Sequence, residues 1–189
     1  MNDSWTRRSF LKNAVAAGGG IALAHVLPAR GATVSETPAV ERAIELYNTH
    51  TSETVSVVYR RGTEYVTRAI DSLRNLMRDH RNDAVHDIDV GLYDQLFELA
   101  LAAGHDARFQ VISGYRSAQS NAQMAARPGS GVAKHSLHIE GRAIDVRLHG
   151  CSCSDLRDLA LTAARGGVGY YRRSDFVHLD TGRFRTWNG

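Results

Sequence analysis

The chain has 189 residues, of which 43% are hydrophobic and 23% are charged, with 23 basic residues against 20 acidic ones. With 17 Gly and only 3 Pro, the composition excludes collagen-like, low-complexity and disordered chains, and the length fits one domain with a targeting segment. The net charge of +3 gives little support for a nucleic-acid partner, because the arginines are scattered rather than gathered in a stripe. The 2 cysteines are too few for a disulfide scaffold, so we expect stability to come from burial.

Residues 1–31 have the pattern of an export signal. The basic segment 6–12, centred on Arg7 and Arg8, precedes an uncharged apolar run over 13–28. The arginine pair and its neighbours resemble the twin-arginine signal of bacteria, which implies the twin-arginine export machinery as a partner and the periplasm as destination. The run contains Gly18 to Gly20, which weaken a helix, so we expect no stable membrane span in the mature form.

The position of signal cleavage has two candidates, after Gly31 and after Ala32, and an uncleaved anchor is the alternative. Cleavage after Gly31 removes four basic residues and one acidic residue, which leaves 19 of each sign in the domain over 32–189. The positive charge of the whole chain is therefore a property of the signal, and we expect no nucleic-acid partner.

The pattern past the signal predicts a single compact α+β domain with a small antiparallel sheet packed by helices. Short β-rich or alternating segments predict strands over 42–48, 54–60, 109–113, 142–148, 169–171 and 176–180. Apolar residues at helical spacing predict helices from Thr63 to about 81, over 90–103, over 117–126, and over 154–165 with Ser154 as the cap. The first two strands form a hairpin, and residues 127–134 form a loop.

Candidate metal ligands lie in the second half of the chain. The array His-x-x-Gly-x-Ala-x-Asp runs from His138 to Asp145, and His178 follows about thirty residues later. Gly141 lets the chain turn between the loop with His138 and the strand with Asp145, so the two side chains converge. Two imidazoles and one carboxylate make a three-ligand zinc site with a fourth position for water.

This array, with Ser136 before it and His178 after it, resembles the zinc D-Ala-D-Ala peptidase family of the vancomycin-resistance dipeptidases and carboxypeptidases. Segments 112–117, 166–171 and 176–182 look closer to its exported, murein endopeptidase K-like branch. The resemblance covers roughly 42–189 and implies a Hedgehog/DD-peptidase-like fold. It also implies one Zn²⁺ per chain, bound by His138, Asp145 and His178, with Arg116 beside the metal to stabilise an oxyanion.

The catalytic base departs from the family pattern. The family has a Glu three residues before the last zinc histidine, where this chain has the shorter Asp175. The alternative is Asp180, which shares a strand face with His178 and could reach the zinc water or hold His178 by a hydrogen bond. Both aspartates are therefore candidates for the general base.

The resemblance implies a periplasmic zinc metallopeptidase that hydrolyses the peptide cross-links of peptidoglycan, with its stem peptides as substrates. Two alternatives stay open: a zinc D,D- or L,D-carboxypeptidase that trims stem peptides, and a non-catalytic peptidoglycan-binding module that has lost its base. The remaining histidines are expected to be structural or exposed. Cys151 and Cys153 are expected to be plain thiols or a strained disulfide, since their spacing is unlike that of a zinc pair.

Overall fold

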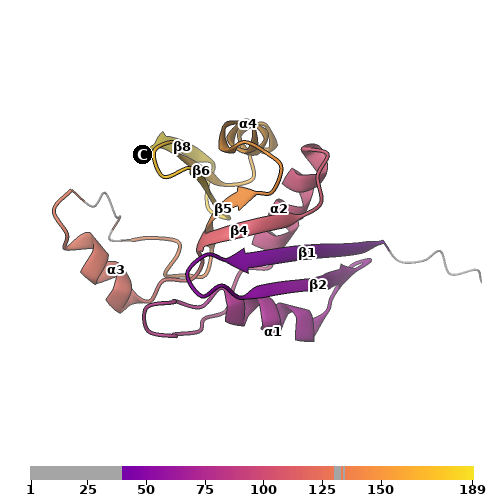
Figure 1. Ribbon diagram of the computed structural model, residues 1–189, viewed down its shortest axis with the longest axis horizontal. Coiled ribbons are helices and arrows are strands. Elements are labelled where there is room, and N and C mark those ends of the chain that lie inside the picture. The colour runs from indigo at the N-terminus through magenta and orange to yellow at the C-terminus, as the bar shows by residue number, and fades with distance from the viewer. Residues whose placement is uncertain (1–39, 130–132, 134) are drawn as a thin grey trace, which may run out of the picture. The chain divides into compact units, whose positions relative to one another are not determined.

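The computed structural model describes residues 40–129, 133 and 135–189, and these belong to one compact α+β unit. The export-signal prediction for 1–31 lies outside the described residues. Eight strands are found in the described part: β1 (Glu41–Asn48), β2 (Thr54–Arg61), β3 (Glu64–Tyr65), β4 (Arg108–Ser113), β5 (Ala143–Leu148), β6 (Gly167–Tyr171), β7 (Phe176–Asp180) and β8 (Arg185–Asn188). The helices there are α1 (Thr67–Leu76), α2 (Gly91–Ala102), α3 (Ala118–Ala125) and α4 (Cys153–Ala163) (Figure 1).

The strands form one mixed sheet in the order β3-β2-β1-β4-β5-β7-β6-β8. The prediction of a small antiparallel sheet is therefore wrong: β1 pairs with β4 and β6 pairs with β8 in parallel. A strand pattern predicts that a segment is extended but does not say which distant strand it pairs with. Parallel pairing requires a long crossover, and the crossover from β1 to β4 contains α1 and α2.

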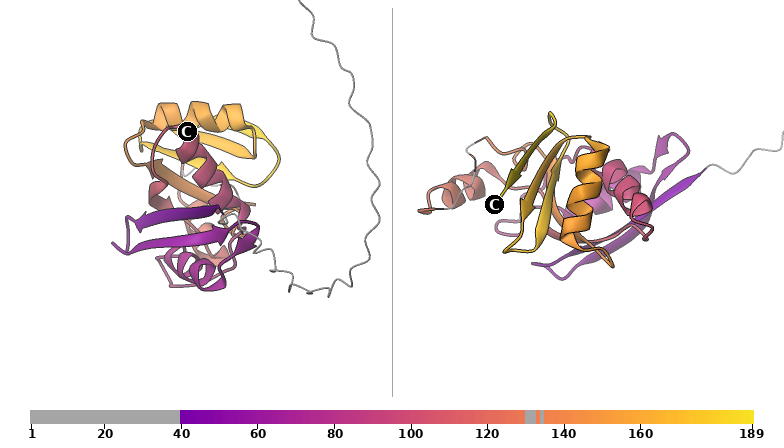
Figure 2. Two further views of the ribbon diagram at one scale, coloured as in Figure 1. Left: turned by 90° about the vertical axis from the view of Figure 1, so that its right-hand side faces the viewer. Right: turned by 90° about the horizontal axis from the view of Figure 1, so that it is seen from above.

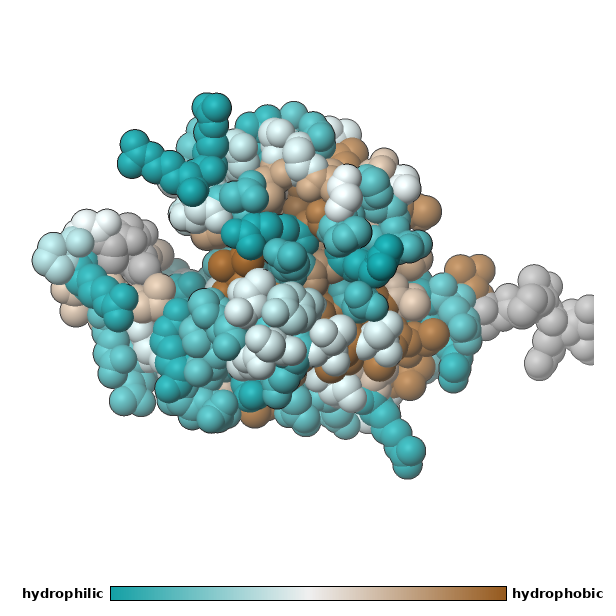
Figure 3. All heavy atoms as spheres, viewed as in Figure 1, coloured by the Kyte–Doolittle hydropathy of each residue, from teal (hydrophilic) through white to brown (hydrophobic). Residues whose placement is uncertain are grey.

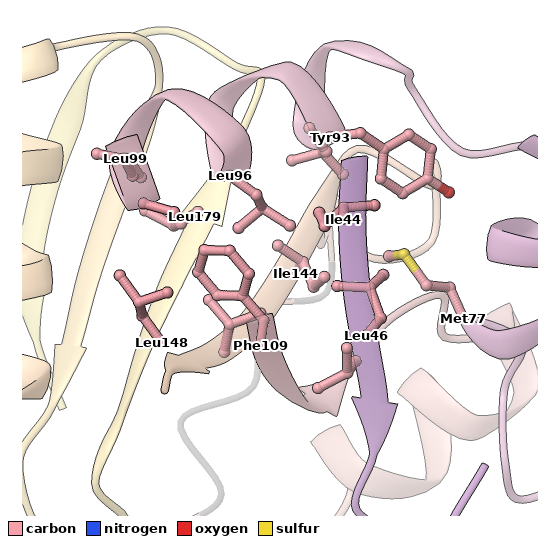
Figure 4. Packing of buried hydrophobic residues seen from close by; sticks show 14 of the residues in the cluster. Ile44, Leu46, Met77, Tyr93, Leu96, Leu99, Phe109, Ile144, Leu148 and Leu179 are labelled. Atoms are coloured by element: carbon pink, nitrogen blue, oxygen red, sulfur yellow. The ribbon is translucent and has the colours of Figure 1, made fainter. Parts of the chain in front are cut away.

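One face of the sheet carries the hydrophobic core. Alternate strand residues such as Leu46, Phe109 and Ile144 are buried against α1, α2 and α4. Figure 4 shows Leu96 and Leu99 of α2 among these strand residues, and Figure 2 shows α2 and α4 side by side. The other face of β5 and β7 is free of these helices and carries polar side chains, which include Asp145 and His178.

Several element ends differ from prediction. Residues 64–65 pair with β2 as β3, so α1 begins after Val66 rather than at Thr63. The helix ends at Leu76, whose carbonyl oxygen accepts a 2.9 Å hydrogen bond from Nδ2 of Asn48. The cap of α4 is Ser152, not Ser154, because its Oγ accepts from the backbone N–H of Asp155. Strand β8 was not predicted.

The surface seen in Figure 3 is mostly hydrophilic, and the hydrophobic side chains visible there lie among polar ones. In the part of the chain that the structure describes, no helix combines the length and apolar character needed to cross a membrane.

Candidate metal centre

The turn before β5 places His138 over the polar face of the sheet. Gly141 has a φ of 65°, and a Cβ there would come within 2.0 Å of the carbonyl oxygen of Asp87. Only glycine fits this combination of positive φ and close backbone approach. The tight turn joins the loop with His138 to the strand with Asp145, as the sequence predicts.

Residues of four strands line up across this face. Ser113 of β4 lies opposite Asp145 of β5, Asp145 lies opposite His178 of β7, and His178 lies opposite Gly169 of β6. Residues opposite one another in a sheet share a face and lie about 5 Å apart. The pairing of β5 with β7 therefore brings together two of the three candidate ligands, which are far apart in sequence.

Three side-chain atoms meet at this point. Nε2 of His138 lies 3.2 Å from Nδ1 of His178 and 3.3 Å from Oδ1 of Asp145, and the last two atoms are 2.9 Å apart. All three residues are at least nine-tenths buried. In the described part of the chain, no other group of three or more His, Cys, Asp or Glu side chains is close enough together to hold a metal.

Hydrogen bonds on the opposite side of each imidazole ring determine which ring nitrogen carries the proton. Nδ1 of His138 lies 2.7 Å from the carbonyl oxygen of Gly114, and Nε2 of His178 lies 3.1 Å from Oδ2 of Asp180. Both oxygens only accept hydrogen bonds, so these two nitrogens carry the ring protons. In the neutral rings, the nitrogens that face Asp145 then present lone pairs.

Three electron-pair donors thus converge in a buried space, and this arrangement requires a positive charge. A proton on His178 is one source: burial lowers its pKa, but hydrogen bonds to Asp145 and Asp180 dominate and raise it to about 8. Although burial raises the pKa of Asp145, the neighbouring His138 and His178 hold it far below its usual value. A single proton bridges only one pair of atoms, whereas a metal ion contacts all three.

The donor set fits zinc. Tetrahedral zinc with bonds of about 2.0–2.2 Å to nitrogen and oxygen places its ligand atoms about 3.3 Å apart. The three observed separations, 2.9 to 3.3 Å, approach this value without rearrangement of the backbone. The outer hydrogen bonds that the two rings donate to Gly114 and Asp180 are of the kind that orient metal-binding histidines.

Asp180 is fully buried and surrounded by donors. Its Oδ1 accepts from the backbone N–H groups of Gly167 and Gly182, and Arg185 donates to both of its oxygens, at 3.1 and 2.7 Å. Burial raises the pKa of Asp180, but hydrogen bonds from His178, Arg185 and the backbone hold it well below its usual value. A carboxylate held in this way orients His178 and is a poor proton acceptor.

Asp175 lies in the turn between β6 and β7, with a φ of 52° and a side chain that is 70% exposed. Its Oδ2 is 3.5 Å from Nε of Arg147, which is two residues past Asp145 on the same face of β5. Burial and the neighbouring Asp175 raise the pKa of the Cys153 thiol to about 12. The structure does not place Asp175 in the group formed by His138, Asp145 and His178.

Arg116 is buried beside this group. Its terminal nitrogens make long contacts, 3.3 Å to Asn121 Oδ1 and 3.4 Å to Ser113 Oγ, and its Nε has no partner among the described residues. Burial lowers the pKa of Arg116, and the charge of Asp145 opposes this shift. The guanidinium therefore retains donor capacity toward a further acceptor.

Sequence reasoning predicted a strand over 169–171, within β6, but singled out neither Tyr171 nor Trp187 and missed β8. Trp187 lies opposite Gly169, with its ring centroid 5.0 Å from that of His178, and Tyr171 lies two residues along β6 on the same face. The sequence signal for β8 was the β-branched Thr186 next to the aromatic Trp187, residue types that favour strands, but this segment is too short for a strand prediction.

Comparison with known proteins places these observations in a family. A family model described as peptidoglycan L,D-endopeptidase MepK (Peptidase_M15_2) matches residues 36–187. The peptidoglycan L,D-endopeptidase MepK of Escherichia coli (strain K12) is 41% identical over 170 residues, 89% of this chain and 92% of the relative. The probable peptidoglycan L,D-endopeptidase MepK of Haemophilus influenzae is 39% identical over 173 residues, 90% and 92% of the two chains. No solved structure gives a significant match.

Proposed function

Because the chain belongs to the peptidoglycan L,D-endopeptidase MepK family, we propose that it is a zinc metallopeptidase that hydrolyses peptide cross-links of peptidoglycan. The observation that carries the proposal is the buried group of three lone-pair donors, since a metal ion held by them would activate water for hydrolysis. His138, Asp145 and His178 would bind one Zn²⁺. When bound there, zinc would polarise the scissile carbonyl and lower the pKa of a water molecule so that it attacks near neutral pH.

The two aspartates take different roles in this proposal. Asp180 holds His178 through its ring Nε2–H and is saturated with donors. Asp175 has the more open carboxylate, so it is the candidate to take up the proton of the attacking water and deliver it to the leaving amine. Arg116, with its unused donor capacity, would stabilise the negative charge that develops on the carbonyl oxygen.

The export signal over 1–31 and the enzyme domain over 32–189 form the second part of the proposal. The arginine pair at Arg7 and Arg8 supports twin-arginine export, and the substrate of the relatives supports the periplasm as destination. A balanced charge in the mature domain suits a peptide substrate and gives no attraction to nucleic acid.

The proposal is tested with the exported form and purified muropeptides. Cross-linked dimers joined through L,D bonds, dimers joined through D,D bonds and monomeric pentapeptides are incubated separately, and the products are resolved by chromatography. We expect cleavage of the L,D cross-link, loss of activity with a chelator and recovery with zinc. Trimming of pentapeptides alone would mean a carboxypeptidase, and binding without cleavage would mean a non-catalytic module.

A matched pair of variants ties the activity to the site. His138→Ala removes a ligand and should abolish both zinc binding and cleavage, whereas His149→Ala changes an exposed histidine outside the group and should alter neither. Activity that persists in His138→Ala would show that the proposed centre is not the catalytic one.

A further inference from the structure

Gly167 and Gly169 of β6 leave part of the polar face of the sheet without side chains, and we call this part the glycine strip. A Cβ at Gly169 would come within 2.5 Å of Cε2 of Trp187, and one at Gly167 would come within 2.3 Å of Oδ2 of Asp180 and 2.5 Å of an Arg185 nitrogen. Side chains from β8 therefore cross β6 at the two places where β6 has none. Arg185 reaches Asp180 in this way, and Trp187 reaches the edge of the metal-ligand group.

Trp187 is held in one orientation. Its half-buried indole packs against the His178 ring at a centroid distance of 5.0 Å, and the Arg185 guanidinium lies 5.1 Å above it. Its Nε1–H donates a 3.0 Å hydrogen bond to the hydroxyl oxygen of Tyr171. Because the indole has one donor, this bond uses its whole hydrogen-bonding capacity.

Tyr171 is fixed on two sides and open on a third. Its ring stacks on Phe176 at 4.5 Å, and its oxygen accepts from Trp187. No acceptor for the tyrosine's own hydroxyl hydrogen occurs in the part of the chain that the structure describes. The hydroxyl lies on the polar face of the sheet, where Trp187 joins it to the His178 ring.

We propose that Tyr171 is a catalytic residue whose hydroxyl donates a hydrogen bond to the oxygen of the scissile amide, and that Trp187 is the positioning residue that fixes it. This inference rests on the proposed function. An oxygen that gains negative charge during attack is stabilised best by donors already fixed in place, and Tyr171 and Arg116 would supply a neutral and a charged donor. The glycine strip is then a requirement of catalysis, because a side chain at Gly169 would displace Trp187.

The neighbouring tyrosine provides a matched control. Tyr170 is on the opposite face of β6, where the Arg157 guanidinium lies 4.7 Å from its ring centroid. Tyr171→Phe and Tyr170→Phe thus remove the same atom from adjacent residues, one beside the centre and one remote from it. Both variants keep the ring and its packing.

The test measures kcat and KM on a cross-linked muropeptide dimer, together with zinc content and Tm. We expect Tyr171→Phe to lower kcat about 100-fold with KM within about threefold, because a donor used in the transition state is lost. Trp187→Phe should lower kcat about tenfold, and adding it to Tyr171→Phe should cause little further loss, since it acts through that hydroxyl. Tyr170→Phe should match the wild type.

A second readout is the affinity for a phosphinate analogue of the cleaved dipeptide, measured by calorimetry on the zinc-loaded protein. Tyr171→Phe should weaken its binding by about the same factor as kcat falls, whereas a structural role would change Tm or zinc content instead. A kcat and an analogue affinity within twofold of the wild type would overturn the role of Tyr171, and additive losses in the double variant would overturn that of Trp187. If the wild type fails to cleave any dimer, the proposed function fails instead.

Discussion

Oδ2 of Asp180 lies 3.1 Å from Nε2 of His178, and this contact determines which nitrogen of the ring faces Asp145. The carboxylate is fixed in turn by Arg185 and by two backbone N–H groups, so the ring has a single orientation. The tautomer that presents Nδ1 of His178 toward Asp145 is thus set by a residue two positions further along β7.

Asp180→Asn should weaken zinc binding. The amide offers one acceptor instead of two and places an N–H group where Arg185, Gly167 or His178 now donates, so the imidazole loses its fixed tautomer. We expect affinity for zinc to fall about 10- to 100-fold, measured by competition with a chromogenic chelator. Asp106→Asn, at an exposed aspartate, is the control and should bind zinc like the wild type. Unchanged affinity in Asp180→Asn would mean that His178 is oriented by other contacts.

Asp175→Asn should reduce turnover and leave zinc binding intact. If the carboxylate transfers the proton, its loss should lower kcat by about 10²- to 10⁴-fold, because that is the usual contribution of a general base. The measurement is steady-state hydrolysis of a muropeptide dimer at equal zinc content. The two Asn variants separate the roles of the aspartates: Asp180→Asn should lower the affinity for zinc, and Asp175→Asn should lower kcat. A fully active Asp175→Asn would exclude this residue as the base.

Asp79 should make stability depend on acid. This fully buried carboxylate accepts from both the backbone N–H and the hydroxyl of Ser117, the residue after Arg116. Burial raises its pKa, but hydrogen bonds from Ser120, Ser117 and Arg81 lower it to about 2. Because the pKa of Asp79 is lower in the folded state than its unfolded value near 3.8, the ionised carboxylate stabilises the fold at pH values above 3.8. This stabilisation is lost as the pH falls toward 2.

The contribution of Asp79 at neutral pH is about 2 kcal/mol on this basis. The free energy of unfolding is measured by urea denaturation for the wild type and Asp79→Asn at pH 7 and at pH 2.5. The difference between the two proteins should be large at pH 7 and small at pH 2.5. Asp106→Asn again serves as the control, with no difference at either pH. If Asp79→Asn lowered the free energy of unfolding equally at both pH values, the loss would come from changed hydrogen-bond geometry and not from the charge of the carboxylate.

Gly169→Ala should displace Trp187. The new Cβ would come within 2.5 Å of Cε2 of the indole, so the ring must move away from His178 and from the Tyr171 hydroxyl. We expect a shift in tryptophan fluorescence and a loss of about 1–3 kcal/mol in stability. The same variant should lower kcat if Trp187 fixes Tyr171. A native fluorescence spectrum would contradict the close packing described for this strip.

The sequence predicted the elements better than their arrangement. Periodicity located β1, β2, α2 and β5 within one or two residues, because each has a buried face with a regular repeat. It missed β3, which has only two residues, and β8, which has four with no buried member. The parallel pairings were also missed, since they depend on contacts between segments far apart in the chain.

For the candidate site, the predictable part was the convergence of His138, Asp145 and His178. The array from His138 to Asp145 has a spacing that a single tight turn explains, and His178 carries its own neighbouring pattern. Spacing could not separate Asp175 from Asp180, because only the structure places five N–H donors around Asp180. Tyr171 and Trp187 were out of reach, since their meeting depends on the pairing of β6 with β8.

Both ends of the sheet order are short strands, and this limits how a peptide can bind. Strands β5 and β7, which carry Asp145 and His178, are interior, and β6 and then the edge strand β8 follow β7. Strands are about 4.8 Å apart, so a peptide added to β8 would lie roughly 14 Å from β7. A substrate that reaches His178 must therefore cross the strands over the polar face and be held by side chains instead of extending the sheet. Such recognition places no demand on strand-like backbone geometry, which suits a peptide that contains both L and D residues.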